Sequence, residues 1–321
     1  RKQGLENWSY AHCLPYFKQH EDFHKGADDL HGAGGEWRVE KQRLRWEILD
    51  AFAQAAQEAG RRALALRGTG RWSGDMLADI GDQAADGYLQ GLVRGARPDD
   101  GILSEETADT ATRLSKERVW IIDPLDGTRE YSQLREDWAV HVALTVKGAC
   151  QLGAVALPSQ GRTLWGVCTS THTLGGEVPD ARAEAQLAPL ELHTGASATH
   201  DPLRVAVSRS HTPSWMPAFA QQVNAVEVRC GSVGAKVALL LFGQADLYAH
   251  RKGLKEWDTC APECVARGLG WSVSRLDGTP MRYNAADPRV DEFLVCRPAS
   301  QARVLQGLQA SGALSHRDAK S

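Results

Sequence analysis

The stretch VWIIDPLDGTREYS, residues 119–132, places two acids three residues apart directly after an apolar run. Asp123 and Asp126 are separated by a Pro-Leu pair and followed by Gly127 and Thr128. In such a turn both carboxylates and a backbone carbonyl can converge on one pocket, and Mg²⁺ prefers oxygen ligands. The glycine permits close backbone approach, and the threonine supplies a hydroxyl. The spacing predicts a metal and phosphate site, with an ordinary Asp-rich turn as the alternative.

A second Asp-Gly-Thr triplet, residues 277–279, provides an internal comparison. No Asp-Pro precedes it, and no other acids are placed to share a metal ion with it. We therefore expect it to form only a turn.

Hydrophobic spacing outlines the secondary structure. Helical periodicity predicts helices over 41–67 and 81–96. In the second half, residues 232–250 indicate a helix followed by a strand, and residues 257–270 a helix capped by glycine. Apolar runs predict strands at 101–107, ending in acids, and at 118–124, 138–148, 150–158 and 163–170, and the segment 204–211 begins another strand. Pro124 is expected to stop the second of these strands. The polar stretch 171–203 predicts a loop or domain boundary. This order indicates an α/β protein with two lobes.

We predict three parts: an appendage at 1–40, a metal-binding α/β lobe at 41–175 and a C-terminal α/β lobe at 176–321. Residues about 1–50, which include GLENWSYAHCLPYFKQHEDF, resemble an internal fragment of choline dehydrogenase-like flavin oxidoreductases. The segment has no GxGxxG fingerprint for a dinucleotide, so we expect no activity of its own. A surface extension is the alternative.

Composition excludes several classes of protein. The 321 residues carry a formal net charge of −3, and no basic patch with interleaved aromatics suggests a nucleic-acid partner. No apolar span is long enough for a membrane helix. The seven cysteines include no CxxC pair, which argues against a zinc knuckle or disulfide framework. We predict a cytoplasmic protein, either monomer or homodimer.

Three motifs together carry a family resemblance. LSEE (103–106), WIIDPLDGT (120–128) and EWDTCAPE (256–263), in this order, resemble the metal-dependent, lithium-sensitive phosphomonoesterases. That family includes inositol monophosphatases, fructose-1,6-bisphosphatases and 3′(2′),5′-bisphosphate nucleotidases. The resemblance runs from about residue 50 to the end and implies an inositol monophosphatase-like αβαβα sandwich.

The resemblance also implies a set of metal ligands for two or three Mg²⁺ ions. The implied ligands are Glu105 for the first metal, Asp123 shared between two metals, the Leu125 carbonyl, and Asp126 and Asp258 for the second metal. Glu106 is expected to support them, with a solvated acid as the alternative.

Catalysis in this family uses water, which a threonine and an upstream aspartate orient and deprotonate. Thr128 matches that threonine, and Asp82 fits the aspartate because Gln-Ala-Ala follows it. Asp79 stands where the family has threonine, and Asp79 and Asp75 are alternatives to Asp82. The predicted catalytic group is Asp82, Glu105 and Thr128.

Segments of the second half resemble the CysQ-type bisphosphate nucleotidases: VSRSH (207–211), GSVGAK (231–236) and RLDGTPMRYN (275–284). This implies hydrolysis of adenosine 3′,5′-bisphosphate to AMP and phosphate, within sulfur assimilation. A lysine and a histidine can pair with a phosphate dianion, although a packed lysine or histidine is the alternative. The predicted substrate-binding residues are Gly127, Thr128, Ser208, His211, Ser232, Lys236 and Asp258.

Three rival functions remain open. Inositol monophosphatase or fructose-1,6-bisphosphatase activity on the same scaffold is the nearest. A remnant flavin-linked oxidoreductase is disfavoured by the missing fingerprint, and a non-catalytic binding protein by the intact acids. A nucleophilic-cysteine phosphatase is excluded, because no cysteine precedes an arginine at the Cys-x5-Arg spacing.

Overall fold

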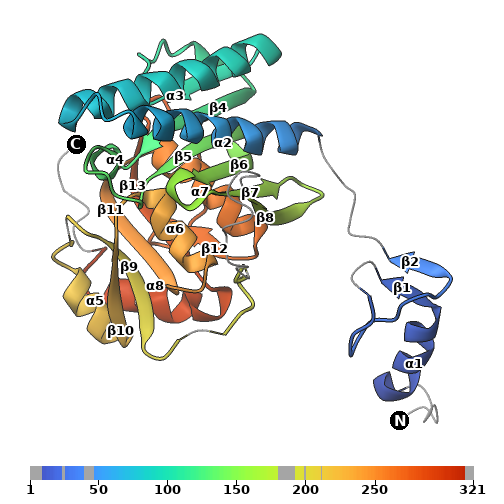
Figure 1. Cartoon of the computed structure of the whole chain (residues 1–321). Helices are drawn as coiled ribbons and strands as arrows, with labels where there is room; N and C mark the ends of the chain where they lie inside the picture. The colour runs from blue at the N-terminus through green and yellow to red at the C-terminus, as the bar shows by residue number, and fades with distance from the viewer. Residues whose placement is uncertain are drawn as a thin grey trace. The chain divides into compact units, whose positions relative to one another are not determined.

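The computed structural model describes residues 9–23, 26–39, 47–179, 192–198, 200–210 and 212–314. The chain divides into two compact units, residues 1–47 and 48–321 (Figure 1). The predicted boundary near residue 175 falls inside the second unit, so the assignment of two lobes as separate domains stays a prediction.

The first unit is small. It contains α1 (Tyr10–His20), β1 (Glu21–Phe23) and β2 (Trp37–Val39), and the two strands pair in parallel. The Glu21 carboxylate accepts a hydrogen bond from the Gly32 N–H at 2.9 Å, and the Phe23 and His31 rings stack at 3.9 Å. These contacts close the loop between the two strands.

The second unit alternates helices and strands. Its helices are α2 (Glu47–Gly68), α3 (Gly74–Ala96), α4 (Thr128–Ser132), α5 (Met216–Gln222), α6 (Val233–Leu241), α7 (Glu256–Gly268) and α8 (Gln301–Ala310). Its short 3₁₀ helices are η2 (Thr112–Ser115), η3 (Pro158–Gln160) and η4 (Pro298–Ser300). Its strands are β3 (Gly101–Ser104), β4 (Arg118–Asp126), β5 (Ala139–Val146), β6 (Ala149–Leu157), β7 (Arg162–Cys168), β8 (Thr173–Pro179), β9 (Leu203–Ser208), β10 (Ala225–Cys230), β11 (Leu247–Lys255), β12 (Ser272–Ser274) and β13 (Arg289–Cys296).

Five layers result, as Figure 1 shows. One mixed sheet has six strands in the order β3-β4-β5-β6-β7-β8, and the other has five in the order β10-β9-β11-β13-β12. Helices α2 and α3 cover the outer face of the six-stranded sheet, and α6 and α7 lie between the sheets. Helices α5 and α8 cover the far face of the five-stranded sheet. The predicted αβαβα sandwich is confirmed.

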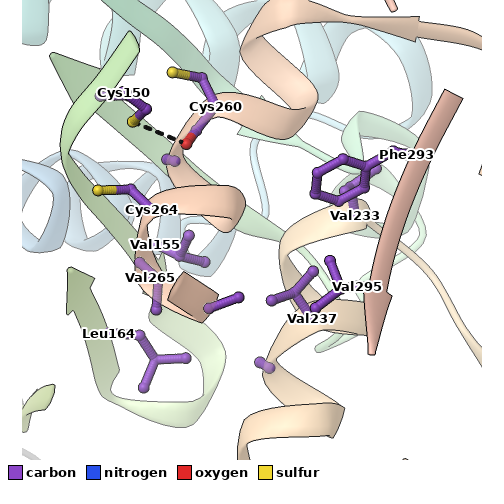
Figure 2. Packing of buried hydrophobic residues seen from close by; sticks show 14 of the residues in the cluster. Cys150, Val155, Leu164, Val233, Val237, Cys260, Cys264, Val265, Phe293 and Val295 are labelled. Atoms are coloured by element: carbon purple, nitrogen blue, oxygen red, sulfur yellow. Dashed lines mark hydrogen bonds between the residues drawn. The ribbon is translucent and has the colours of Figure 1, made fainter. Parts of the chain in front are cut away.

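Strand β4 is buried on both faces, which fixes the strand that carries the first two acids. Trp120 and Ile122 pack toward α2 and α3, whereas Val119 and Ile121 pack into the layer between the sheets. Alternate side chains of a strand point to opposite faces, so the apolar run serves both cores. Figure 2 shows the inner core, where side chains of β6 and β7 meet α7 and α6.

Helix α7 lies unusually close to the six-stranded sheet. A Cβ atom at Gly153 of β6 would come within 2.6 Å of Cys264 Cβ, and one at Gly166 of β7 would overlap the Cys264 carbonyl. The two glycines therefore permit the close approach of the helix that begins beside Asp258.

Several sequence-based expectations were wrong in detail. Strand β3 ends at Ser104 rather than at 107, and β9 ends at Ser208, before the end of the segment 204–211. Helix α3 begins at Gly74 rather than at 81, because Leu77 and Ala78 extend its buried stripe. Strand β4 continues past Pro124 to Asp126, since a register shift between Asp123 and Asp126 accommodates the missing N–H. Strand β8 occupies part of the expected loop 171–203; its paired glycines, which pack against Trp165 and Leu269, lowered the apparent hydrophobicity.

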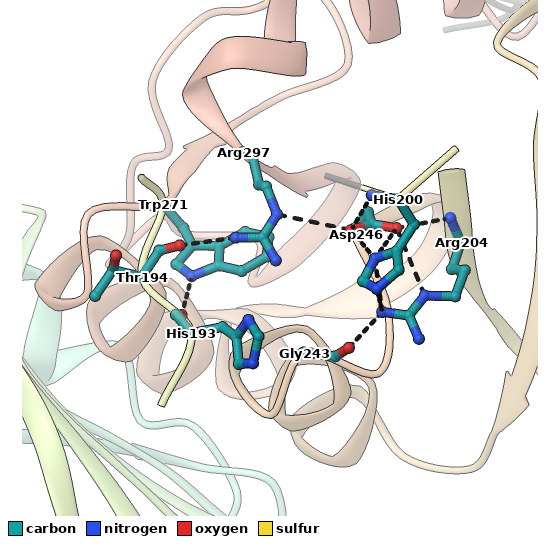
Figure 3. Close-up of polar contacts among 8 residues, drawn as sticks. All are labelled: His193, Thr194, His200, Arg204, Gly243, Asp246, Trp271 and Arg297. Atoms are coloured by element: carbon teal, nitrogen blue, oxygen red, sulfur yellow. Dashed lines mark hydrogen bonds and ion pairs between the residues drawn. The ribbon is translucent and has the colours of Figure 1, made fainter. Parts of the chain in front are cut away.

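A buried polar cluster ties the segment 192–198 to the C-terminal half (Figure 3). The fully buried Arg297 stacks on Trp271, with its guanidinium carbon 4.4 Å from the ring centroid, and donates to the Thr194 carbonyl at 2.7 Å. Asp246 neutralises this arginine at 3.6 Å and also contacts His200 at 2.9 Å.

None of the helices in the described residues is long and apolar enough to cross a membrane.

Candidate active site

Three carboxylates meet at the end of β4, two from the strand itself and one from α7. One oxygen each of Asp123, Asp126 and Asp258 lies within 4.8 Å of the others. In the pairing of β4 with β5, Asp123 lies opposite His141 and Asp126 lies opposite Ala139. The bulge between Asp123 and Asp126 turns both acids toward Asp258 of α7. Such crowding of oxygen ligands suits a hard divalent cation.

Asp126 is held by the start of α6. Its two carboxylate oxygens accept the N–H groups of Val233 at 3.1 Å and Gly234 at 2.6 Å. His141 Nε2 lies 3.1 Å from the same carboxylate. Burial works to raise the pKa of Asp126, but His141, the Gly234 N–H and Lys236 lower it below its ordinary value. Asp126 is therefore charged without a metal ion.

Sequence reasoning missed His141. The side chain is completely buried, and its Nδ1 donates to the Trp257 carbonyl at 3.1 Å. It thus links the acid turn to the residue before Asp258. The available signal was a single imidazole within the apolar run WAVHVALTV, at the position that faces Asp123 across the sheet.

Asp123 shows the clearest need for a cation. Its Oδ1 accepts the Leu125 N–H at 3.1 Å, whereas its buried Oδ2 has no hydrogen-bond partner among the described residues. Burial, followed by the charges of Glu105, Asp126 and Asp258, raises its pKa well above the ordinary value. A buried acceptor without a donor is costly, and a bound cation would relieve it.

Asp258 lies in the first turn of α7, where it accepts the Lys255 N–H at 2.5 Å. Burial and then Asp126 and Glu105 raise its pKa to about 7. Glu105 follows β3, and its N–H donates to the Ile122 carbonyl of β4 at 3.3 Å. Glu105 is exposed as a whole, but the desolvation of its carboxylate, with Glu106 and Asp126 nearby, raises its pKa to about 7.

Asp86 of α3, a buried acid that supports the Glu105 loop, is another residue that the sequence analysis missed. It accepts hydrogen bonds from the Ser104 hydroxyl at 2.5 Å and the Thr107 hydroxyl at 3.1 Å, on either side of the two glutamates. Glu106 itself is exposed, and its pKa is raised by partial burial and by Asp86 and Asp79.

Of the three candidate aspartates on α3, the structure brings Asp82 to Thr128. Asp82 is 4% exposed, and its Oδ1 has no partner among the described residues. Burial and then Glu106 and Glu105 raise its pKa to about 8, and a hydrogen bond with Thr128 partly offsets this. Asp79 and Asp75 are exposed on the same helix. The catalytic role of Asp82 stays a prediction.

The turn between these groups requires glycine. Gly127 has a φ of 91°, which side-chain-bearing residues rarely adopt, and a Cβ there would lie 2.8 Å from Ser232 Cβ. The Thr128 hydroxyl donates to the Leu125 carbonyl at 3.1 Å. The turn therefore aligns the Asp126 carboxylate, the Leu125 carbonyl and the Thr128 hydroxyl at the start of α6.

Residues 42–312 match the model of the inositol monophosphatase family. The chain belongs to the inositol monophosphatase family. Among curated relatives, the 3′-phosphoadenosine 5′-phosphate phosphatase of Mycobacterium leprae is 37% identical over 283 residues, which cover 84% of this chain and 96% of the relative. The 3′(2′),5′-bisphosphate nucleotidase CysQ of Escherichia coli K12 is 29% identical and covers 74% of this chain and 94% of its own length.

Solved structures agree on the fold. CysQ from Bacteroides thetaiotaomicron superposes with a TM-score of 0.64 at 24% identity, covering 79% of this chain and 98% of that protein. Inositol monophosphatase II from Staphylococcus aureus gives 0.66 at 19% identity, covering 85% and 96%. The predicted family and its fold are confirmed. These matches lend no support to the predicted resemblance to flavin oxidoreductases.

Two of the predicted substrate-binding residues, Ser232 and Lys236, lie at the start of α6. Ser232 Oγ accepts the Ala235 N–H at 3.1 Å, and the buried Lys236 donates to the Gly231 carbonyl, with Nζ 5.2 Å from the Tyr248 ring centroid. Ser208 ends β9 and is half-buried. His211 lies outside the described residues. Substrate contacts by these residues stay a prediction.

The second Asp-Gly-Thr triplet forms a turn. Asp277 Oδ1 accepts the Thr279 N–H at 3.0 Å and the Thr279 hydroxyl at 2.6 Å, and Gly278 has a φ of 86°. Among the described residues, the clustered acids are Asp123, Asp126 and Asp258, and Asp277 is not one of them. The Asp-Gly-Thr sequence therefore forms only a turn at residues 277–279, whereas at residues 126–128 its aspartate belongs to a carboxylate cluster.

Proposed function

We propose that this protein is a Mg²⁺-dependent phosphomonoesterase that hydrolyses adenosine 3′,5′-bisphosphate to AMP and phosphate. The chain is an enzyme of a metal-dependent phosphatase family. The observation that carries the substrate assignment is the 37% identity to a named 3′-phosphoadenosine 5′-phosphate phosphatase across almost its whole length. The acid cluster supports the chemistry.

The donor set fits divalent cations. The unpartnered, buried Asp123 Oδ2 and the raised pKa values of Asp123, Glu105 and Asp258 all indicate unneutralised negative charge. We propose that the carboxylates of Glu105, Asp123, Asp126 and Asp258 and the Leu125 carbonyl hold two or three Mg²⁺ ions. Divalent cations bound there would neutralise the phosphate ester and lower the pKa of water.

Thr128 and Asp82 are proposed to move the proton. The attacking water gives its proton to the Thr128 hydroxyl, which passes its own proton to Asp82. The pKa of Asp82 is about 8 in the metal-free protein, and cations bound among the neighbouring acids would lower it, so that Asp82 could be ionised and accept a proton near neutral pH. In the structure the Thr128 hydroxyl lies 3.1 Å from the Leu125 carbonyl and also interacts with Asp82, so it can turn its proton from one acceptor to the other.

The substrate side of the site is proposed from the same region. Gly127 and Thr128 adjoin the acid cluster, to which Asp258 belongs, and these three residues are proposed to bind the phosphate group. Contacts to the nucleotide are proposed for Ser208, His211, Ser232 and Lys236. Lys236 would have to release the Gly231 carbonyl to reach a phosphate. We further propose a cytoplasmic monomer or homodimer without a nucleic-acid partner. The small negative net charge and the six buried, unpaired cysteines support this setting.

The deciding experiment compares phosphate release from adenosine 3′,5′-bisphosphate, inositol 1-phosphate and fructose 1,6-bisphosphate with Mg²⁺, and then with added Li⁺. We expect the highest kcat/KM for the nucleotide and inhibition by Li⁺. A clear preference for either sugar ester would transfer the assignment to an inositol or fructose bisphosphate phosphatase.

A further inference from the structure

Arg113, in the 3₁₀ helix η2, is a buried arginine outside the groups already described. Only 1% of it is exposed, and a buried guanidinium must be fully paired to be tolerated. Its Nη2 donates to Asp109 at 2.7 Å and to the Ala285 carbonyl at 2.9 Å, and its Nη1 donates to Asn284 Oδ1 at 2.7 Å. The Asn284 amide returns a hydrogen bond to the Arg113 carbonyl at 3.3 Å. Arg113 therefore joins two segments far apart in the sequence.

The far end of this link is the first turn of α7. Asn284 and Ala285 donate their N–H groups to the two oxygens of Glu256, at 2.7 and 2.8 Å. Glu256 is itself 1% exposed and lies two residues before Asp258 on the same helix. The link thus runs from Arg113 through Asn284 to the residue that begins the helix of a candidate metal ligand.

The near end is the loop that carries Glu105. This loop leaves β3 after Ser104 and returns to β3 at Arg113, since a Cβ at Gly101 would lie 2.9 Å from Arg113 Cβ. At its start, Asp86 holds the Ser104 hydroxyl. At its end, Arg113 holds Asp109 and the 284–285 segment. Glu105 therefore lies in a loop that is fastened at both ends.

We propose that Arg113 and Asn284 are positioning residues that set the separation of the Glu105 loop from the start of α7, and thereby the affinity of the site for divalent cations. The inference rests on the proposed function, because it takes Glu105 and Asp258 as metal ligands. Neither residue is proposed to touch the substrate or a metal ion.

Asn284 offers a matched pair of variants. Its φ is 62°, a conformation that glycine adopts freely and that aspartate tolerates better than most residues. Asn284→Gly keeps the backbone N–H to Glu256 and removes the bond to Arg113. Asn284→Asp keeps an oxygen acceptor for Arg113. The exposed Asp287, which pairs with Arg289 in the same segment, supplies the control Asp287→Ala.

The experiment titrates Mg²⁺, and separately Mn²⁺, into each full-length protein by isothermal calorimetry, with kcat and KM measured at saturating Mg²⁺. For Asn284→Gly we expect the metal Kd to rise roughly 10-fold, the lower end of the usual effect of losing a group that orients a ligand. We expect KM to stay within about twofold and kcat to recover at high Mg²⁺. Asn284→Asp and Asp287→Ala should bind metal as the unaltered protein does.

Three results would overturn the inference or separate it from the proposed function. If Asn284→Gly lowers the melting temperature but leaves the metal Kd unchanged, Asn284 only stabilises the fold. If the unaltered protein binds neither metal ion, both proposals fail. If it binds metal but does not release phosphate from the nucleotide, the proposed function fails, while a weakened Asn284→Gly still supports the positioning role. Should Asn284→Gly not fold, Asp109→Asn tests the near end of the link and should weaken metal binding in the same direction.

Discussion

Asp123 is buried among acids, with one oxygen unpartnered and a strongly raised pKa. Asp277 is exposed, and the residues of its own turn satisfy one of its carboxylate oxygens. Both aspartates stand in or beside an Asp-Gly-Thr sequence, so the difference between them comes from the neighbouring residues that the fold brings together. A buried, unneutralised carboxylate destabilises the folded protein when no cation is bound, and a bound cation removes this cost.

We therefore expect Asp123→Asn to lower kcat/KM by roughly 10³-fold or more, on the scale of losing charge stabilisation in a transition state. The same variant should melt at a higher temperature than the unaltered protein in EDTA, because an amide avoids the cost of burying or protonating the Asp123 carboxylate among other acids. Phosphate release and thermal unfolding measure the two effects.

Asp277→Asn serves as the control, and it should leave activity nearly unchanged. Equal losses of activity in two well-folded variants would mean that the site lies elsewhere.

At the scale of single residues, the sequence predicted the acids better than it predicted the residues that hold them in place. Asp123, Asp126 and Asp258 stand in short motifs whose spacing can be read along the chain. His141 and Arg113 act through contacts with residues 116 and 171 positions away, Trp257 and Asn284. No local pattern marks such residues, because the fold alone creates their partners.

At the scale of elements, the start of α6 is the most constrained junction. The Asp126 carboxylate accepts two N–H groups there, and a Cβ at Gly234 would overlap His141 Nε2 and lie 2.8 Å from Ala139 Cβ. In contrast, Gly87 on the exposed side of α3 has open space around its Cα. Gly234 is therefore closely packed, whereas Gly87 has room for a side chain.

Gly234→Ala should lower the free energy of unfolding by about 1–3 kcal/mol, as overpacked sites do. Gly87→Ala should raise it by about 0.5–1 kcal/mol, because alanine favours the helix. Urea unfolding of both variants tests the pair. A stabilised Gly234→Ala would contradict the close packing of α6 on β5.

Periodicity predicted most of these elements but missed some of their ends. Helix α3 starts earlier than its strongest apolar spacing, and β4 passes through Pro124 by means of a bulge. Both deviations occur beside Asp82 and the acid turn. There, tertiary contacts with the neighbouring strand and helix outweigh local preference.

At the scale of the whole molecule, the acids make stability depend on pH and metal. The pKa values of Asp82, Glu105 and Asp258, about 8, 7 and 7, exceed their ordinary values near 4. The metal-free folded protein therefore holds protons that the unfolded chain releases, and its stability must fall as pH rises from about 4 to about 8.

In EDTA we expect the melting temperature to be roughly 5 °C or more lower at pH 8.5 than at pH 6. Added Mg²⁺ should reduce this difference, since a ligand that binds only the folded state stabilises it. Scanning calorimetry at the two pH values, with and without Mg²⁺, tests this. A melting temperature that rises with pH in EDTA would contradict the raised pKa values.

The first unit contributes none of the described site residues, and all three hydrophobic clusters lie in residues 48–321. Deletion of residues 1–40 should therefore leave kcat/KM within about twofold and the main unfolding transition in place. Phosphate release and scanning calorimetry of the shortened chain provide the measurements. A loss of activity would assign the segment a part in the enzyme that its sequence did not predict.

Helix α7 seats Asp258 while its backbone presses against Gly153 and Gly166 of the sheet beneath it. A helix in that position has no room to sink closer, and any larger residue at either glycine would push it and its acid outward together. We therefore expect changes of substrate specificity in this fold to arise in parts of the site other than α7. The start of α6, directly after β10, is constrained in the same way because it donates two N–H groups to Asp126, so a change of substrate that keeps the metal ligands is expected to use the loop after β9 instead.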